Sequence, residues 1–434
     1  MRSSKGLSAF CILHFALAIL LSLAPGCGRK LAEVNVYITD EKTRLESEVL
    51  GKYQDLATEP LVIPSAKASS PPGAPALPLS GKAAQEALRQ FQDNLAFLRK
   101  PGPMFAGRRE QECATLYNIA ALHSSLGQTA EALKSLGEAE QLADACQLFD
   151  LKWKILFEQA LLRDADRLAL LRKAVDALET APQFMVKAAP ANARLKGNLY
   201  QNVVLDLMAK NEVEPALAYA ERFATQETVC LLAHEVLAFS DPNHAEFMAG
   251  FDEAKAKLLA AHARLAAATD ATRPKAQKDF QAALKQYRDH IAKPPAEAAA
   301  LAPLLRVTAP EAVEVLEYLP KDTCLVRYFL TPQKVVAWTL SAEGLRPAMV
   351  EAGRPFNETL GRLSANPLRY TADDLAVLSK TLVEPVAARL EKTARVYLVA
   401  EGKLSNVPWP ELPCGKGRMI DRFQLGFAAS LTHF

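Results

Sequence analysis

The spacing of apolar residues divides the chain into a long helical part and a shorter part with strand character. From about Gly81 to Ile291, apolar residues recur three and four positions apart, which is the period of an amphipathic helix. In the first such segment, one predicted helix face carries Leu88, Phe91, Leu95 and Leu98. The Lys100–Pro103 stretch contains two prolines and a glycine, which end this helix.

Small residues mark a helical hairpin between Glu110 and Ala143. The small residues are Ala120, Gly127, Ala132 and Ala139, and the pattern also includes Leu116 and Leu136. A second set with similar spacing lies at Tyr200, Val204, Asn211, Ala216 and Ala220. Small residues at such positions let the two helices of a pair cross closely, and the pattern resembles the tetratricopeptide repeat.

The distance between the two sets predicts longer units than the standard repeat. Gly127 and Asn211 lie 84 positions apart, whereas the tetratricopeptide unit is about 34 residues long. Two hairpins of about 42 residues fit that distance, with Trp153 to Leu178 supplying the helices between them. We therefore expect residues 81–244 to form a degenerate tetratricopeptide-like helical solenoid, with a generic α-helical bundle as the alternative.

Heptad spacing distinguishes residues 245–300 from the helices before them. The first arm places Phe247, Phe251, Ala254, Leu258, Ala261 and Leu265 at alternating steps of four and three. The second arm has the same steps at Phe280, Leu284, Tyr287 and Ile291. Thr272 and Pro274 suit the N-cap and first turn of the return helix. The pattern predicts an antiparallel, coiled-coil-like hairpin.

After Leu301 the apolar pattern becomes that of strands. Thr323–Leu330 and Val335–Leu340 are β-rich runs joined by a short segment with a proline, which predicts a β-hairpin. Further strands are expected at Arg346–Glu351, Arg395–Ala400 and Met419–Ala429. A helix face precedes the strand at 395–400 and carries Leu375, Leu378, Leu382, Val386 and Leu390. Residues 301–434 are thus predicted to form an α/β domain, and the whole chain an α plus α/β fold.

The N-terminal part of the chain, before Gly81, has the pattern of an export signal followed by a linker. Arg2 and Lys5 precede the nearly unbroken apolar stretch Phe10–Leu23, which predicts a signal peptide over residues 1–26. Cys27 follows small residues in an arrangement that resembles a bacterial lipobox, which would make Cys27 the lipidated first residue. A plain secretory signal and an uncleaved anchor helix are the alternatives. Six prolines between positions 60 and 78 predict an extended tether within residues 27–80.

Composition excludes several classes of function. The 434 residues include 51 Lys and Arg against 49 Asp and Glu, and this balance lacks the basic excess that nucleic-acid binding needs.

The cysteines after Cys27 are too widely spaced for a zinc site, and we expect each to be a small buried residue: Cys113, Cys146, Cys230, Cys324 and Cys414. One or two disulfides could still form in an oxidising compartment. No cofactor or metal motif occurs in the sequence, so we expect neither.

The C-terminal part resembles the CHAT domain, the caspase-like peptidase domain associated with tetratricopeptide repeats. The segments that carry the resemblance are Val315–Phe329, Val396–Leu404, Val407–Pro413, Met419–Arg422 and Ala429–Leu431. Ala400, Glu401 and Trp409 depart from the residues that are usual in that family. The resemblance covers residues 301–434 and implies the N-terminal half of such a domain.

In that family, the catalytic His and Cys lie beyond the matching region, each at the end of a sheet strand. The resemblance therefore implies that this chain has no catalytic dyad and is not an enzyme. His433 and Cys414 lie near the end, but neither has the sequence context of that dyad. We expect the other histidines to be structural, and Asp373 and Asp374 to form a solvated helix cap.

These observations predict an exported interaction protein on the periplasmic side of a bacterial membrane, or alternatively a secreted one. It would contact the membrane through the lipid on Cys27 and bind protein partners through the helical repeats. The expected binding face includes Tyr117, Asn118, His123, Tyr200, Asn202 and Val203. In the incomplete domain, the strand at 395–400 would have an open edge. A shortened form of an active CHAT-type peptidase and a lipoprotein with an unrelated α/β binding domain are the alternatives.

Overall fold

The computed structural model describes residues 81–100, 107–186, 190–234, 241–269, 271–301, 305–428 and 430–431. The expected signal peptide (1–26), the lipidation residue Cys27, the tether (27–80) and His433 lie outside these residues. The described residues belong to one compact unit. None of their helices is both long enough and apolar enough to cross a membrane.

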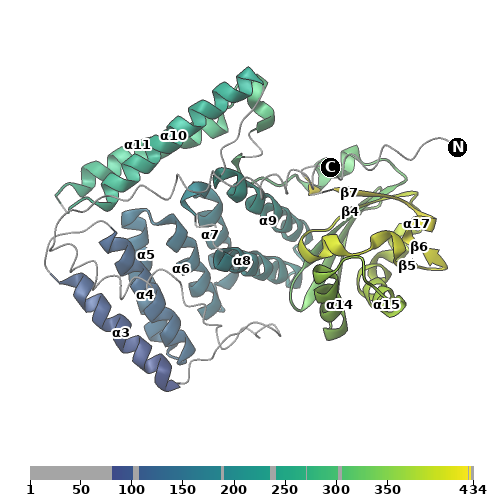
Figure 1. Cartoon of the computed structure of the whole chain (residues 1–434), viewed down its shortest axis with the longest axis horizontal. Coiled ribbons are helices and arrows are strands. Elements are labelled where there is room, and N and C mark those ends of the chain that lie inside the picture. Colours follow the sequence, from purple (N-terminus) through teal and green to yellow (C-terminus); the bar gives the residue numbers. More distant parts are fainter. Residues whose placement is uncertain are drawn as a thin grey trace. The chain divides into compact units, whose positions relative to one another are not determined.

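The described residues between 81 and 234 are mostly helical, as their apolar period predicts, and after a leading helix they form antiparallel pairs (Figure 1). The leading helix is α3 (Gly81–Arg99). The pairs that follow it in the described residues are α4 (Arg108–Ser125) with α5 (Thr129–Cys146), α6 (Phe149–Leu162) with α7 (Arg167–Thr180), and α8 (Pro190–Ala209) with α9 (Val213–His234). The first helices of the pairs begin at even intervals along the chain, and the interval is close to the long unit that the sequence predicts. We call α3 to α9 the helical array.

Two turns between paired helices use residues in the left-handed region of backbone conformation. Gly127 joins α4 to α5 with a φ of 75°, and Asn211 joins α8 to α9 with a φ of 59°. Glycine adopts this conformation without a Cβ clash, and asparagine tolerates it better than most residues do. The same two positions define the repeat spacing in the sequence. The sequence spacing therefore located these turns correctly.

The hairpin expected at 245–300 consists of α10 (Pro242–Ala266) and α11 (Arg273–Ala292). Its heptad residues form one buried cluster that includes Phe247, Phe251, Leu258, Phe280, Leu284 and Tyr287. The cluster also contacts the helical array: ring centroids of Phe149 and Phe280 lie 6.1 Å apart, and those of Phe184 and Tyr287 lie 5.3 Å apart. Phe184 belongs to the short helix η2 (Gln183–Met185), and η3 (Ala296–Leu301) follows the hairpin. Thr272 is the N-cap of α11 as expected, but its side chain makes no capping hydrogen bond.

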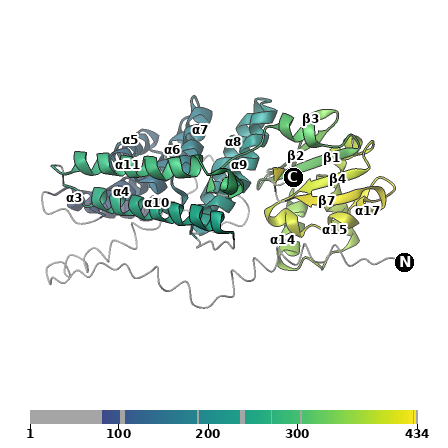
Figure 2. The ribbon, with the colours of Figure 1, turned by 90° about the horizontal axis from the view of Figure 1, so that it is seen from above.

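The C-terminal part contains a mixed five-stranded sheet in the order β3-β2-β1-β4-β7 (Figure 2). Its strands are β1 (Thr323–Leu330), β2 (Lys334–Ser341), β3 (Gly344–Glu351), β4 (Arg395–Val399) and β7 (Gln424–Ala428). β1, β2 and β3 form an antiparallel meander, whereas β4 pairs in parallel with both β1 and β7. Leu325 of β1 is in register with Leu340 of β2 and with Tyr397 of β4.

Strand alternation gives this sheet two apolar faces. One face, with Val326, Tyr328 and Leu398, is covered by α14 (Arg354–Ala365) and α15 (Ala372–Leu382). Shorter elements accompany these helices in the chain: η4 (Glu384–Val386), α16 (Ala387–Leu390), η5 (Gly402–Asn406), η6 (Trp409–Glu411), β5 (Pro413–Cys414), β6 (Gly417–Arg418) and α17 (Met419–Arg422). Trp409 is fully buried among them, and its indole Nε1 donates to the backbone oxygen of Leu404 at 3.1 Å.

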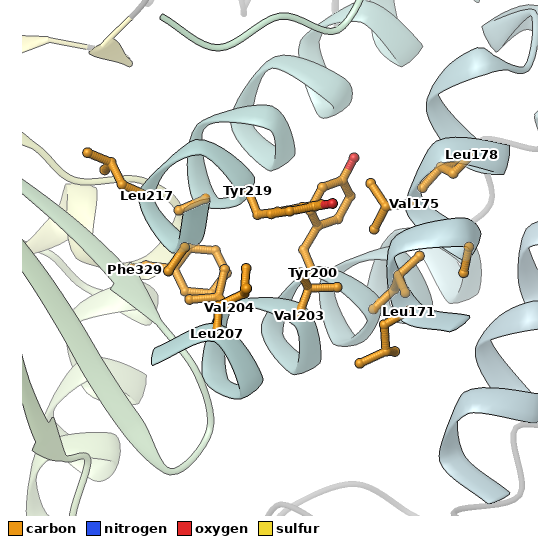
Figure 3. Packing of buried hydrophobic residues seen from close by; sticks show 14 of the residues in the cluster. Leu171, Val175, Leu178, Tyr200, Val203, Val204, Leu207, Leu217, Tyr219 and Phe329 are labelled. Atoms are coloured by element: carbon orange, nitrogen blue, oxygen red, sulfur yellow. The ribbon is translucent and has the colours of Figure 1, made fainter. Parts of the chain in front are cut away.

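The opposite face of the sheet packs on the helical array (Figure 3). Residues from β1, β2, α8 and α9 share one apolar cluster, which includes Leu325, Phe329, Val336, Trp338, Tyr200, Val204, Leu207 and Leu217. The ring of Phe223 on α9 meets that of Phe329 edge to face, with centroids 6.1 Å apart. The helix α13 (Ala312–Tyr318) adds Val315 to the same cluster. One apolar core is therefore shared by the helical array and the sheet.

Two expectations for the strands are wrong. The strand at 395–400 has no open edge, because β4 pairs with β1 on one side and with β7 on the other. Both faces of β4 are also covered, since Val399 lies in one apolar cluster and Leu398 in the other. Met419–Ala429 is not a single strand: a capping box between Arg418 and Asp421 starts α17, and only Gln424–Ala428 forms β7.

Asp374 is not the solvated cap that the sequence suggested. It closes a capping box with Thr371 at the start of α15, but its side chain is buried. Its carboxylate also pairs with Arg362 and accepts a hydrogen bond from Thr359 at 3.2 Å, both on α14. The residue therefore ties α15 to α14 across the covered face of the sheet.

Candidate binding cavity

A cavity of about 360 Å³ lies where α11 meets the helical array. Its lining comes from the end of α3, the first turns of α4, the second half of α5 and the first residue of α11. The charged and sulfur-containing lining residues are Arg99, Arg109, Glu112, Glu138, Cys146 and Arg273, and Leu116 and Leu142 add an apolar wall. Binding sites commonly combine an apolar wall with a few convergent polar groups.

Glu112 organises the charges at this cavity. Its Oε1 accepts from Arg99 Nε at 2.9 Å, and its Oε2 accepts from Arg109 Nη1 at 2.9 Å. Arg99 Nη2 also reaches Glu138 Oε2 on α5 at 2.9 Å. The Glu112 side chain is only 7% exposed, so these ion pairs offset the cost of burying its charge. Burial by itself lowers the pKa of Arg99, but its hydrogen bonds to Glu138 and Glu112 raise that pKa overall.

Arg273 brings the hairpin to the same cavity. Its Nη2 donates to the backbone oxygen of Ala268 at 3.1 Å, and its Nη1 lies 3.6 Å from Cys146 Sγ. One turn further along α11, Gln277 donates to the backbone oxygen of Ala145 at 3.2 Å. Burial raises the pKa of Cys146, while the positive charges of Arg273 and Arg109 oppose that rise. The thiol is therefore uncharged near neutral pH and forms part of the wall.

Arginines from three helices thus converge on one cavity. A guanidinium group stays protonated at physiological pH and binds carboxylate or phosphate groups through paired N–H donors. It does not exchange protons in this pH range, so the arrangement suits recognition of an anionic group and not acid–base catalysis. Glu112 and Glu138 hold the net charge of the lining to a small positive value.

Most of the residues expected to form a binding face lie in the core instead. Tyr117, Asn118, Tyr200 and Val203 are each at most 3% exposed, so the expectation is wrong for these four. The reason is that α4 packs against α3, α5 and α6, and α8 packs against α7 and α9. The Tyr117 hydroxyl donates to Glu158 at 3.5 Å and the Tyr200 hydroxyl to Glu179 at 2.6 Å, so both serve internal pairing.

The other two residues of the expected face are half-buried and engaged within the array. Nδ1 of His123 lies 2.6 Å from Gln128 Oε1, and Asn202 accepts a hydrogen bond from Arg167. Among the repeat-pattern residues, Leu116 does line the cavity. The apolar pattern of the sequence did not indicate the cavity arginines, because polar residues at helix ends follow no apolar period. In addition, 164 positions separate Arg109 from Arg273, so their proximity has no local sequence signal.

The described cysteines are all buried thiols, as expected, and they lie at Cys113, Cys146, Cys230, Cys324 and Cys414. Cys414 lies in β5, where Arg422 Nη1 is 3.3 Å from its Sγ. His262 and His290 lie on the hairpin helices and pack against the rings of Phe280 and Phe247. In the part of the chain that the structure describes, no group of three His, Cys, Asp or Glu is placed to hold a metal ion.

A second cluster of charges lies where the helical array meets the sheet. Arg327 of β1 is fully buried and pairs with Glu221 of α9 and with Glu401 at 2.8 Å. Its Nη2 also donates to the backbone oxygen of Ala220 at 3.1 Å. Glu221 accepts from the backbone N–H of Leu431 at 2.6 Å. Because protein acceptors already engage the Arg327 guanidinium, the cluster serves to join α9, β1 and Leu431. The cavity is therefore the better candidate for a binding site.

The functional proposal for this protein therefore rests on the geometry of the cavity. Neither a protein-family model nor a curated protein matches this chain.

Proposed function

We propose that this chain is an exported, lipid-anchored interaction protein that binds an acidic segment of a protein partner in the cavity between the helical array and α11. The observation that carries the proposal is the convergence of Arg99, Arg109 and Arg273 from three separate helices on one cavity. A partner carboxylate between Arg109 and Arg273 would accept charge-assisted hydrogen bonds from both α4 and α11.

The arrangement of elements supports a scaffold role. Helix pairs that begin at even intervals along the chain fit a tetratricopeptide-like solenoid, which is a fold that presents binding surfaces. The parallel pairing of β1, β4 and β7 beside α14 and α15 agrees with the resemblance of residues 301–434 to a CHAT domain. We infer that this part is a CHAT-like domain, which braces the helical array through their shared core.

Membrane attachment in this proposal rests on the sequence around Cys27. A diacylated Cys27 would hold the chain on the periplasmic side of the membrane, because two acyl chains suffice for stable anchoring. Intact-mass analysis of the membrane-extracted protein should find a mature chain that begins at Cys27 and carries the acyl mass. A mature N-terminus at another residue would contradict the anchor, while leaving the cavity proposal to its own test.

Titration of a glutamate-rich peptide into the purified full chain tests the cavity. The glutamine version of the peptide serves as the ligand control and should not bind. The double variant Arg109→Gln/Arg273→Gln should bind the glutamate peptide at least about tenfold more weakly, which corresponds to about 1.4 kcal/mol. Affinity should also fall as salt concentration rises, because salt screens partly exposed charges.

A variant outside the cavity separates specific binding from general charge attraction. The Arg354 side chain on α14 is 86% exposed and pairs with Glu358, so Arg354→Gln removes a positive charge without touching the cavity. We expect this variant to bind the peptide as the native chain does. Retained affinity in the double variant, with unchanged circular dichroism, would overturn the proposal, and so would equal weakening by Arg354→Gln.

A further inference from the structure

A buried amine and a buried thiol face each other between α8 and α9. Lys196 Nζ lies 3.3 Å from Cys230 Sγ, and the two residues are 4% and 6% exposed. Buried apolar residues lie beside them on both helices at Leu195, Leu199, Val229 and Ala233, and the buried polar residues Asn192 and Gln226 lie one turn before them. Buried lysines are usually paired with carboxylates, whereas the hydrogen bond of this amine goes to a sulfur atom.

We propose that Lys196 and Cys230 are a modification site, at which peroxide oxidation joins the two side chains through a sulfur–nitrogen bond. In the first step, the Cys230 sulfur bonds to one oxygen of hydrogen peroxide and the O–O bond breaks. The products are a sulfenic acid on Cys230 and one water molecule, and the peroxide takes up the two electrons that sulfur loses.

In the second step, the Lys196 ammonium group first gives one proton to solvent, which frees the lone pair of its nitrogen. The amine nitrogen then attacks the sulfur and the S–O bond breaks. The departing hydroxide takes a second proton from the nitrogen and leaves as water, so that an S–NH linkage remains. Sulfenic acids form such sulfenamides with nearby backbone nitrogen atoms, and the same chemistry applies to a side-chain amine at contact distance.

The geometry favours this trapping over further oxidation. The 3.3 Å separation of nitrogen and sulfur is already that of reacting atoms held in a near-attack arrangement. The bond would tie α8 to α9 across 34 positions of the chain, in the helix pair that packs on the sheet. The inference is independent of the proposed function, since Lys196 and Cys230 do not line the cavity.

Cys146 supplies a matched comparison within the same chain. It is buried like Cys230 and also has a cationic neighbour, with Arg273 Nη1 3.6 Å from its sulfur. A guanidinium group is a poor nucleophile, so oxidation of Cys146 should not produce a cross-link. The two sites therefore separate the effect of a nucleophilic amine from that of a nearby positive charge.

Peptide mapping of the full chain after treatment with hydrogen peroxide tests the proposal. We expect the tryptic peptides that contain Lys196 and Cys230 to be joined, at a mass lower by two hydrogen atoms than their sum. Trypsin should fail to cut after Lys196, and dithiothreitol should restore both the cut and the free thiol. The Lys196→Arg variant should lose the cross-link and carry sulfinic acid on Cys230 instead.

The native chain alone can overturn the proposal, so the test does not depend on how the variant folds. Cys230 that stays unmodified, or that is oxidised without joining Lys196, would contradict it. A cross-link at Cys146 of equal yield would also contradict it, because that result would show that a neighbouring amine is not required.

Discussion

Arg327 and Glu221 show how buried charges are handled at the scale of single residues. Both side chains are fully buried, and they come from positions 106 residues apart in the chain. Glu179 behaves similarly, because it accepts hydrogen bonds from Arg222 and Tyr200. An unpaired buried charge costs several kcal/mol, so these residues depend on partners that no local sequence pattern indicates.

Arg327→Met should therefore destabilise the protein strongly. The change leaves the Glu221 carboxylate buried without its guanidinium partner, and such losses cost about 3–5 kcal/mol in unfolding free energy. Arg418→Met is the control, since Arg418 is half exposed in its pairs with Glu411 and Asp421. In urea unfolding, that control should lower the free energy of unfolding far less than Arg327→Met does, because solvent screens exposed ion pairs. Similar losses in both variants would contradict the importance of the buried cluster.

Glu158 should make stability depend on pH. Burial raises the pKa of Glu158 from 4.5 to about 7, and the hydrogen bond from Tyr117 opposes this rise only partly. Between these two pKa values the folded chain binds a proton that the unfolded chain has lost. The contribution of Glu158 to the free energy of unfolding therefore falls as pH rises from about 4.5 to about 7. The total fall is up to about 3 kcal/mol.

The variant Glu158→Gln isolates this effect, because glutamine keeps an acceptor for Tyr117 and does not titrate. We expect it to be more stable than the native chain at pH 8 and nearly equal to it at pH 5, as measured by urea unfolding. An identical pH dependence in the two proteins would show that Glu158 titrates normally in the folded state.

At the scale of elements, the local apolar period located most helices and strands. The expected strands at 323–330 and 335–340 correspond to β1 and β2, and the heptads correspond to α10 and α11. The period failed at Met419–Ala429, because the capping box of Arg418 and Asp421 is a polar signal that starts a short helix inside an apolar run. It also failed for the pairing of β4, which depends on strands that lie far away in the sequence.

Two glycines of the array, Gly127 and Gly137, should respond oppositely to the same substitution. Gly127 has a φ of 75°, which strains any residue with a Cβ, so Gly127→Ala should cost about 1 kcal/mol. Gly137 lies inside α5, and a Cβ there would meet nothing within 4 Å. Gly137→Ala should therefore stabilise the protein by about 0.5–1 kcal/mol. Urea unfolding measures both changes, and shifts of the same sign would contradict the assignment of Gly127 as the turn residue.

At the scale of the whole molecule, the sequence suggests three successive parts: helical repeats over residues 81–244, a hairpin over 245–300 and an α/β domain from 301. In the structure, β1 and β2 share an apolar core with α8 and α9, and Glu221 links Arg327 to Leu431. The apolar pattern indicates which face of a helix or strand is buried. It does not indicate which element covers that face, because the two elements are distant in sequence. The same limit explains the cavity, whose arginines come from α3, α4 and α11.

The central claim is that an acidic segment binds between the helical array and α11, and hydrogen exchange by mass spectrometry can locate that binding. The full chain is compared with and without a saturating glutamate-rich peptide. The account predicts slower exchange at the cavity, in the start of α4, the end of α5 and the first turn of α11, and no change in α14 or α15. Protection confined to α14 and α15, or no protection at the cavity while the peptide is bound, would contradict the claim.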